Sequence, residues 1–147
     1  MASRNSQQRS HVVGAYRFMV ELDGMLVAGF SEVSGLSVET EVYEHAEGGL
    51  NQYVHRLPGR TRLTPLVLRR GMTLTNELWS WYSQVLQGKI VRKSGSVILY
   101  DELEQEFRRW NFYEAYPTKW SGPDFNASSS EVAIESIELT HNGFKVL

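Results

Sequence analysis

The feature that most constrains this chain is the alternation of apolar and other residues in several short segments. It is clearest at residues 16–22, where Tyr16, Phe18, Val20 and Leu22 are each separated by one residue. A period of two places successive side chains on opposite faces of the backbone, so each such segment is predicted to be a strand with one buried face. Further strands are predicted from residue 25 to a break or bend at Ser34-Gly35, and at residues 37–44, 61–70, 96–101, 107–116 and 131–141.

Turn residues and breaks in the pattern predict how these strands begin, end and bend. Asp23-Gly24 is a two-residue hairpin signal, so the first two strands are expected to pair with each other. Pro65 favours a sheet edge or a bulge for the segment 61–70, and Pro117 is expected to end the segment 107–116. The alternation slips within the last strand, and a β-bulge near Glu135-Ser136 would restore one apolar face.

One segment, Thr75–Gln87, has the spacing of an amphipathic helix instead. Thr73 or Thr75 can cap its start, and Gly88 can end it. Its apolar face is formed by Leu74, Leu78, Trp81, Tyr82, Val85 and Leu86. Several strands with a single helix predict a mainly β protein, a small antiparallel β-barrel or sandwich with one packed α-helix.

Length and composition favour one domain. The chain has 147 residues, no cysteine and a net charge of −2, so its stability is expected to come from packing and assembly rather than from disulfides. Residues 1–12 are polar and predict a flexible N-terminal arm, either frayed or ordered on a neighbouring subunit, ahead of a domain at residues 13–147. The absence of a signal-like start and of a long apolar run predicts synthesis in the cytoplasm and no membrane insertion.

Patterns that carry chemistry are weak throughout the sequence. Gly29–Val33 has only one of the two glycines of a nucleophile elbow, and phosphate-binding glycine motifs are absent. His45 lies near Glu44 and Glu47, which allows a metal site, although a solvated loop explains the same residues. The carboxylates of residues 101–106 fall in a predicted turn. We therefore expect no catalytic residue, no metal and no cofactor.

The charges around a long predicted loop, residues 46–60, are segregated. An acidic stretch contains Glu39, Glu41, Glu44 and Glu47, and a basic stretch contains Arg56, Arg60, Arg62, Arg69 and Arg70. Two interpretations remain open. The stretches are two strands of one hairpin that neutralise each other, or the acidic edge of one copy binds the basic edge of the next. Head-to-tail contacts of the second kind close into rings where the rotation permits.

A series of motifs in a fixed order resembles the tail tube proteins of contractile phages and of extracellular contractile injection systems. The resemblance covers about residues 16–144. Its motifs are Phe18–Gly24 (FMVELDG), Ala28–Leu36 (AGFSEVSGL), Glu47–Gly49 (EGG), His55–Gly59 (HRLPG), Leu68–Gly71 (LRRG), Leu78–Trp81 (LWSW), Trp110–Phe112 (WNF), Ala115–Trp120 (AYPTKW) and Ser129–Glu135 (SSEVAIE).

This resemblance implies a β-barrel flanked by one helix, similar to the type VI secretion tube protein Hcp. It implies hexameric rings that stack into a hollow tube, with joined sheets around a lumen that conveys a protein effector or phage DNA. The implied partners are further copies, a sheath protein, and baseplate and tube-terminating proteins. The implied location is a phage virion or an extracellular particle assembled in the bacterial or archaeal cytoplasm.

The resemblance also implies that the segment Glu44–Arg62 reaches across subunit and ring boundaries. Together with the segregated charges, it gives a set of candidate interface residues: Glu39, Glu41, Glu44, Glu47, Gly48, Gly49, Tyr53, Arg56, Leu57, Pro58, Gly59, Arg60 and Arg62. Three alternative functions are a tube-initiating baseplate subunit, a β-barrel module that binds ligands such as glycans, and a small hydrolase. The missing catalytic motifs argue against the hydrolase.

Overall fold

The computed structural model describes residues 12–23, 29–46 and 54–147, and within them the chain forms nine strands and one helix. Their bounds are β1 Phe18–Leu22, β2 Phe30–Ser34, β3 Val38–Ala46, β4 Val54–Leu63, β5 Leu66–Gly71, α1 Glu77–Leu86, β6 Lys93–Tyr100, β7 Glu106–Ser121, β8 Ile134–Thr140 and β9 Phe144–Val146. Among the described residues, no helix is both long and apolar enough to cross a membrane.

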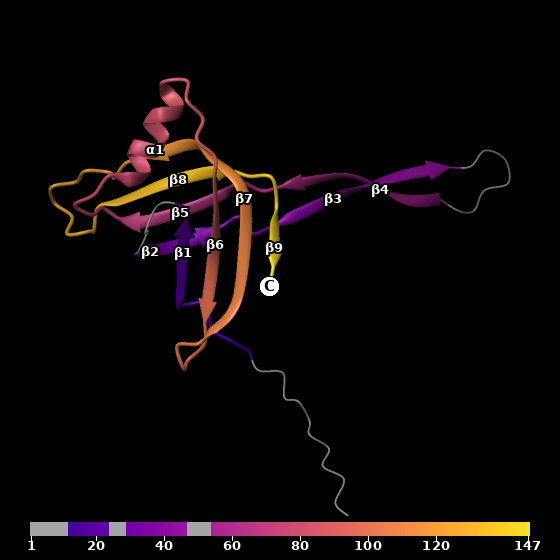
Figure 1. Cartoon of the computed structure of the whole chain (residues 1–147), viewed down its shortest axis with the longest axis horizontal. Helices are drawn as coiled ribbons and strands as arrows, with labels where there is room; N and C mark the ends of the chain where they lie inside the picture. Colours follow the sequence, from indigo (N-terminus) through magenta and orange to yellow (C-terminus); the bar gives the residue numbers. More distant parts are fainter. Residues whose placement is uncertain (1–11, 24–28, 47–53) are drawn as a thin grey trace, which may run out of the picture.

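Two antiparallel layers share the long strand β7 (Figure 1). The first half of β7 pairs with β6 and β9, and β1 extends this layer from β6. The second half pairs with β8, which is followed by β5 and β2. The two halves meet at Ala115 and Tyr116, next to Glu114, whose backbone has a φ of +54°. The described strands do not close into a barrel, because β1 and β2 remain end strands, but the predicted mainly β class with one helix is confirmed.

The core lies between the two layers and beneath α1. It contains Val20, Leu22, Leu66, Leu68, Leu78, Trp81, Val97, Phe112, Ala115, Ile137 and Leu139. Leu78 and Trp81 are the helix residues buried in it. The indole N–H of Trp81 donates to the carbonyl oxygen of Val91 at 2.8 Å, so the helix and the segment that follows it are held together. The helix therefore closes one side of the core, as its apolar spacing predicts.

The ends of the helix agree in part with expectation. Gly88 ends it with a φ of +82°. The amides of Gly88 and Lys89 donate to the carbonyls of Val85 and Gln84, which satisfies the last turn. The prediction of a threonine cap is wrong, because the cap position is Asn76, and the hydroxyls of Thr73 and Thr75 lie 3.0 Å from each other.

The expected hairpin between the first two strands stays a prediction. Residues 24–28, which contain the predicted turn glycine and the start of the return strand, lie outside the described residues. Within the described residues, β1 pairs with β6, and β2 pairs with β5, so these two strands lie in different layers.

The last long strand has no bulge where one was predicted. β8 pairs with β5 in unbroken register from Ile134 to Leu139. Its buried face contains Glu135, Ile137 and Leu139. The apparent slip in the pattern arises because a glutamate occupies an inward position. Pro117 also lies inside β7 and does not end it; the register shifts immediately after it.

Candidate assembly surfaces

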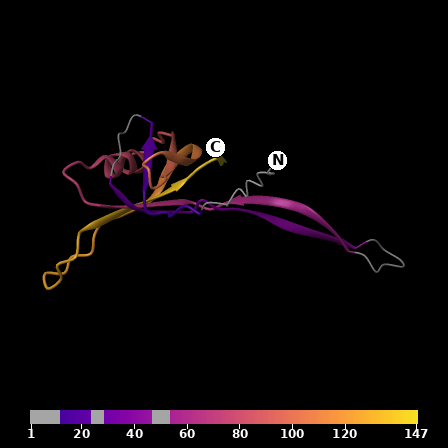
Figure 2. The same ribbon diagram turned by 90° about the horizontal axis from the view of Figure 1, so that it is seen from below.

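The described residues of the predicted loop 46–60, which are Ala46 and residues 54–60, are strand. β3 continues to Ala46 and β4 begins at Val54, and the two form an antiparallel hairpin in which Val38 lies opposite Leu63 and Ala46 opposite Val54. This long hairpin extends well away from the rest of the molecule (Figures 1 and 2). The predicted strand 61–70 is accordingly split into the end of β4 and the start of β5, with Thr64 and Pro65 between them.

The root of the long hairpin is fixed by close backbone contacts. Gly35 has a φ of +97°, and a Cβ atom at this position would clash with the carbonyl oxygen of Pro65. The amide of Thr64 donates to Ser37, and the buried His141 ring lies 3.1 Å from the carbonyl oxygen of Thr64 through Nε2. Glycine is therefore required at position 35, both for the backbone conformation and for the close approach.

The hairpin exposes apolar side chains without a core of its own. Every described side chain of β4 is exposed, and Val42 and Tyr43 on β3 are 64% and 59% exposed. An isolated two-stranded hairpin is marginally stable in water, and contiguous exposed apolar surface is typical of interaction sites. The hairpin thus has the character of a surface that is covered in an assembly.

The segregated charges face one another across this hairpin. Glu44 lies opposite Arg56, with 3.9 Å between Oε1 and Nε, and Arg62 contacts Glu41 at 2.5 Å. Both pairs are largely exposed, so each contributes little to stability. The structure thus contains the pairing within one hairpin, which was one of the two interpretations. Pairing between copies remains a prediction.

The structure places the predicted interface residues as follows. Glu39, Glu41, Glu44, Arg56, Leu57, Pro58, Gly59, Arg60 and Arg62 all lie in the long hairpin. Glu47, Gly48, Gly49 and Tyr53 lie outside the described residues. Pro58 and Gly59 belong to β4 rather than to a loop, next to a register shift in the ladder. A role for these residues in contacts between copies stays a prediction.

Two further surfaces were not found by sequence reasoning, because they depend on strand order. In the layer β7-β8-β5-β2, β2 is the strand at one side, and the segment Tyr116–Ser121 of β7 is at the other. Among the described strands, each of these pairs on one side only. Unpaired strand edges readily accept another strand. Pro117 in the second segment was a local signal, because a proline within a strand indicates an edge or a bulge, but it was interpreted as the end of the strand.

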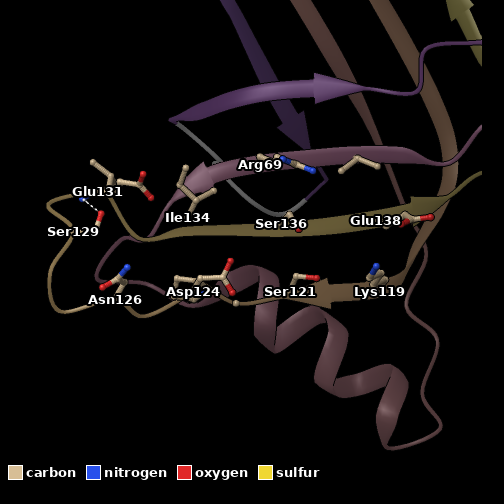
Figure 3. A pocket seen from close by; sticks show the side chains of 14 residues that line it. Arg69, Lys119, Ser121, Asp124, Asn126, Ser129, Glu131, Ile134, Ser136 and Glu138 are labelled. Carbon is tan, nitrogen blue, oxygen red and sulfur yellow. Dashed lines mark hydrogen bonds between the residues drawn. The ribbon is translucent and has the colours of Figure 1, made fainter.

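One face of this four-stranded layer is not covered by the rest of the fold. Figure 2 shows the helix and the other layer on the same side of it. On the opposite side, a pocket of about 590 Å³ lies between the strands and the loop 122–133 (Figure 3). Its charged lining residues are Arg69, Lys119, Asp124, Glu131 and Glu138. This bare face is therefore polar and carries both signs of charge.

A buried ionic network lies on the covered face of the same layer. Arg70 Nε donates to Glu135 at 2.7 Å, and its Nη2 donates to Glu77 at 2.8 Å. The indole of Trp120 donates to the second oxygen of Glu135 at 3.3 Å. The hydrogen bond from Arg70 lowers the pKa of Glu77 to about 2. The network joins β5, β8, β7 and the first turn of α1.

The sequence from residue 14 to residue 145 matches the profile of the family described as T4-like virus tail tube protein gp19. The match covers almost the whole chain. The chain belongs to the tail tube protein family. It is thus a structural tube protein of the contractile injection type, as its motifs predict. No curated protein sequence matches this tail tube protein.

Solved structures show the same fold. A chain of the anti-feeding prophage baseplate is 28% identical, with a TM-score of 0.83, over 94% of this tail tube protein and 97% of that chain. A chain of the PVC sheath/tube terminator of an extracellular contractile injection system is 26% identical, with a TM-score of 0.85, over 95% and 99%. Hcp1 from Flavobacterium johnsoniae is 19% identical, with a TM-score of 0.50, over 86% and 93%, and shares the fold.

Proposed function

We propose that this protein is the repeating subunit of the inner tube of a contractile injection system or phage tail, and that six copies form a ring by sheet joining. The observation that supports this most directly is the pair of free edges, β2 and Tyr116–Ser121, at opposite sides of one layer. Two different edges produce a heterologous contact, which closes into a ring when the rotation permits. The ring size of six agrees with the sixfold symmetry of the similar baseplate structure.

The strand directions suit such a joint. All pairs in this layer are antiparallel, and the layer has four strands, so β2 runs opposite to β7. When β2 of one copy is added beside β7 of the next, the new pair is also antiparallel. Any number of copies can therefore continue the same alternation, and closure removes every free edge of the layer.

The polar face of the joined layer would line the lumen, because the opposite face is occupied by the core and the helix. A lining with both signs of charge, such as Arg69, Lys119 and Glu138, would hold water and give no single-sign surface for a passing molecule to bind. We propose that this lumen conveys a protein effector or phage DNA. The helix side would then face outward, toward the sheath.

The long hairpin would bridge to neighbouring copies and to the next ring. Its exposed apolar residues and its marginal independent stability support this role. Replacement of residues 43–57 by a two-residue turn should leave a folded subunit that forms rings but no long tubes. Negative-stain electron microscopy measures the outcome, and normal long tubes from the shortened variant would contradict the bridging role.

A mixing experiment tests the sheet joint itself. The chain has no cysteine, so Ser34→Cys on β2 and Ser121→Cys on β7 each introduce one thiol. With a flexible bismaleimide, a mixture of the two variants should give cross-linked dimers, whereas each variant alone should not. Cross-linking within the Ser34→Cys sample alone would indicate a twofold contact of β2 with β2 and would refute the ring.

The remaining parts of the proposal follow from the family and its relatives. The subunit would act as one unit over residues 13–147, with residues 1–12 as an arm, and without catalysis or a cofactor. Its partners would be the sheath around the tube, the baseplate at one end and a terminating protein at the other, consistent with the baseplate and terminator structures that it resembles. It would be assembled in the bacterial or archaeal cytoplasm as part of a virion or an extracellular injection particle.

A second candidate is a tube-initiating subunit of the baseplate. The 28% identity to a chain of a baseplate structure favours it. Copy number separates the two: a main tube subunit is abundant in purified particles, in proportion to tube length, and an initiator is present in a single ring. Quantitative mass spectrometry of intact particles measures this ratio.

A further inference from the structure

A group of large side chains lies at the surface where the helix meets the end of β7. Met72, Trp79, Tyr82 and Trp120 form it, and we call it the aromatic patch; Tyr82 and Trp120 are half-buried. The rings of Trp79 and Trp120 are 4.9 Å apart in an edge-to-face arrangement, and those of Trp79 and Tyr82 are 6.2 Å apart. Trp79 is 39% exposed and Met72 is 44% exposed. Indole rings at the surface of a subunit are typical of binding hot spots.

The aromatic patch also borders an open pocket. The pocket has a volume of about 280 Å³ and is lined by Met72, Asn76, Trp79, Trp120 and Glu135. An apolar group seated in it would gain dispersion contacts with these side chains. The cavity has room for an apolar side chain from another surface.

The patch is held in place from below. Glu135 accepts the indole hydrogen bond of Trp120 at 3.3 Å, and Arg70 fixes the other oxygen of Glu135 at 2.7 Å. Both Arg70 and Glu135 are fully buried. Trp120 therefore has a set orientation, and Trp79 packs on it. A surface that is already ordered loses little entropy when a partner binds.

The aromatic patch lies next to the free edge of β7, where another strand could be added. Trp120 belongs to Tyr116–Ser121, the free edge of β7, and its side chain is on the covered face of the layer with Glu135. Helix α1 packs on β7. A strand added to this edge would thus lie beside the patch. On β2, the side chains that face the core side are Phe30 and Val33, which are half-buried.

We propose that the aromatic patch is the side-chain anchor of the ring, and that its occupant is a second copy of this chain, seated through the core-side face of its β2. This proposal rests on the sheet joint proposed above and adds to it the residues that carry its affinity. The apolar core of one subunit would then continue through Trp120 and Trp79 into the core of the next.

The test uses Trp79→Ala in the full chain, with sedimentation velocity to measure ring formation over a range of concentrations. Truncation of a central tryptophan hot spot should raise the concentration needed for rings at least tenfold. Trp79→Phe should restore most of the assembly. The matched control is Phe107→Ala, because Phe107 is 40% exposed and lies near the opposite end of β7. This variant should form rings at a concentration within twofold of that needed by the wild type.

A second variant covers the case in which Trp79→Ala perturbs the helix. Met72→Asp places a charge in the patch at an exposed position and should also abolish rings while circular dichroism stays native. The proposal would be overturned if both variants formed rings at the same protein concentration as the wild type. Normal rings that no longer recruit the sheath would overturn it too, because the patch would then belong to the sheath. A wild-type protein that forms no rings would instead refute the proposed function.

Discussion

Replacement of Arg70 by methionine is expected to remove a large part of the stability of the subunit. The guanidinium is 2% exposed and contacts the carboxylate of Glu135, which is 1% exposed. Arg70→Met fills most of the space but leaves the carboxylate buried with only the indole of Trp120 as a donor. Loss of one partner of a buried ion pair costs about 3–5 kcal/mol, against a total of about 5–15 kcal/mol for an ordinary domain.

A double variant tests whether the loss comes from the unpaired charge. The double variant Arg70→Met/Glu135→Leu removes both charges and should recover most of the loss at pH 7.

The assay is equilibrium unfolding in urea, followed by tryptophan fluorescence at a concentration where the subunit sediments as a monomer. The matched control is Arg69→Met, the neighbouring arginine, which is half-exposed and lies 4.0 Å from Glu32. The control should lose less than about 1 kcal/mol. The buried ion pair does not have the role assigned to it if Arg70→Met loses no more stability than Arg69→Met, or if the double variant loses as much stability as Arg70→Met.

Three further predictions concern other sites. Glu77→Gln should destabilise the subunit by about 1–2 kcal/mol at pH 7, a discounted value because the carboxylate is partly exposed. The pKa of Glu77 is lowered from 4.5 to about 2, so its contribution to stability is present above pH 4.5 and is lost as the pH falls toward 2. The free energies of unfolding of the two proteins, measured in urea, should therefore converge near pH 2. Gly35→Ala should lower the free energy of unfolding by more than about 3 kcal/mol, because of its positive φ and the clash with Pro65. Gly29 has a φ of +84° but open space around it, so Gly29→Ala should lower the free energy of unfolding by only about 1–2 kcal/mol. Thermal denaturation of both variants measures the difference. Gly95→Ala would press a methyl group on the backbone of Glu21 and the ring of Phe112, and it should prevent accumulation of folded subunit on expression at 37 °C.

The elements that sequence reasoning predicted best are those with a local cause. The helix follows from apolar residues spaced to one face and from Gly88 beyond its end, and both are properties of a dozen consecutive residues. β1 and β6 follow from alternation in the same way. Their partners do not, because pairing depends on which strands bury which faces in the complete fold. The turn signal at Asp23-Gly24 therefore gave no indication that β1 pairs with β6.

The error in the candidate site arose because residues typical of loops can also occupy an exposed strand. Proline, glycine and exposed charge are typical of loops, and all three occur in β4 at Pro58, Gly59 and Arg60. These residues are tolerated there because β4 pairs with a single strand among the described strands, so one of its backbone edges needs no hydrogen-bond donors, and because its side chains are exposed. Glu135 was misread for the opposite reason: its charge occupies an apolar position because Arg70, far away in sequence, neutralises it.

The sharing of β7 between the two layers has a mechanical consequence. In a sandwich of two separate sheets, sliding one sheet over the other is resisted by side-chain contacts and by the loops that join the sheets. Here sixteen consecutive residues run from one layer into the other, so a shearing force on one layer reaches the other through covalent backbone. The two layers therefore resist separation through the main chain as well as through side-chain contacts.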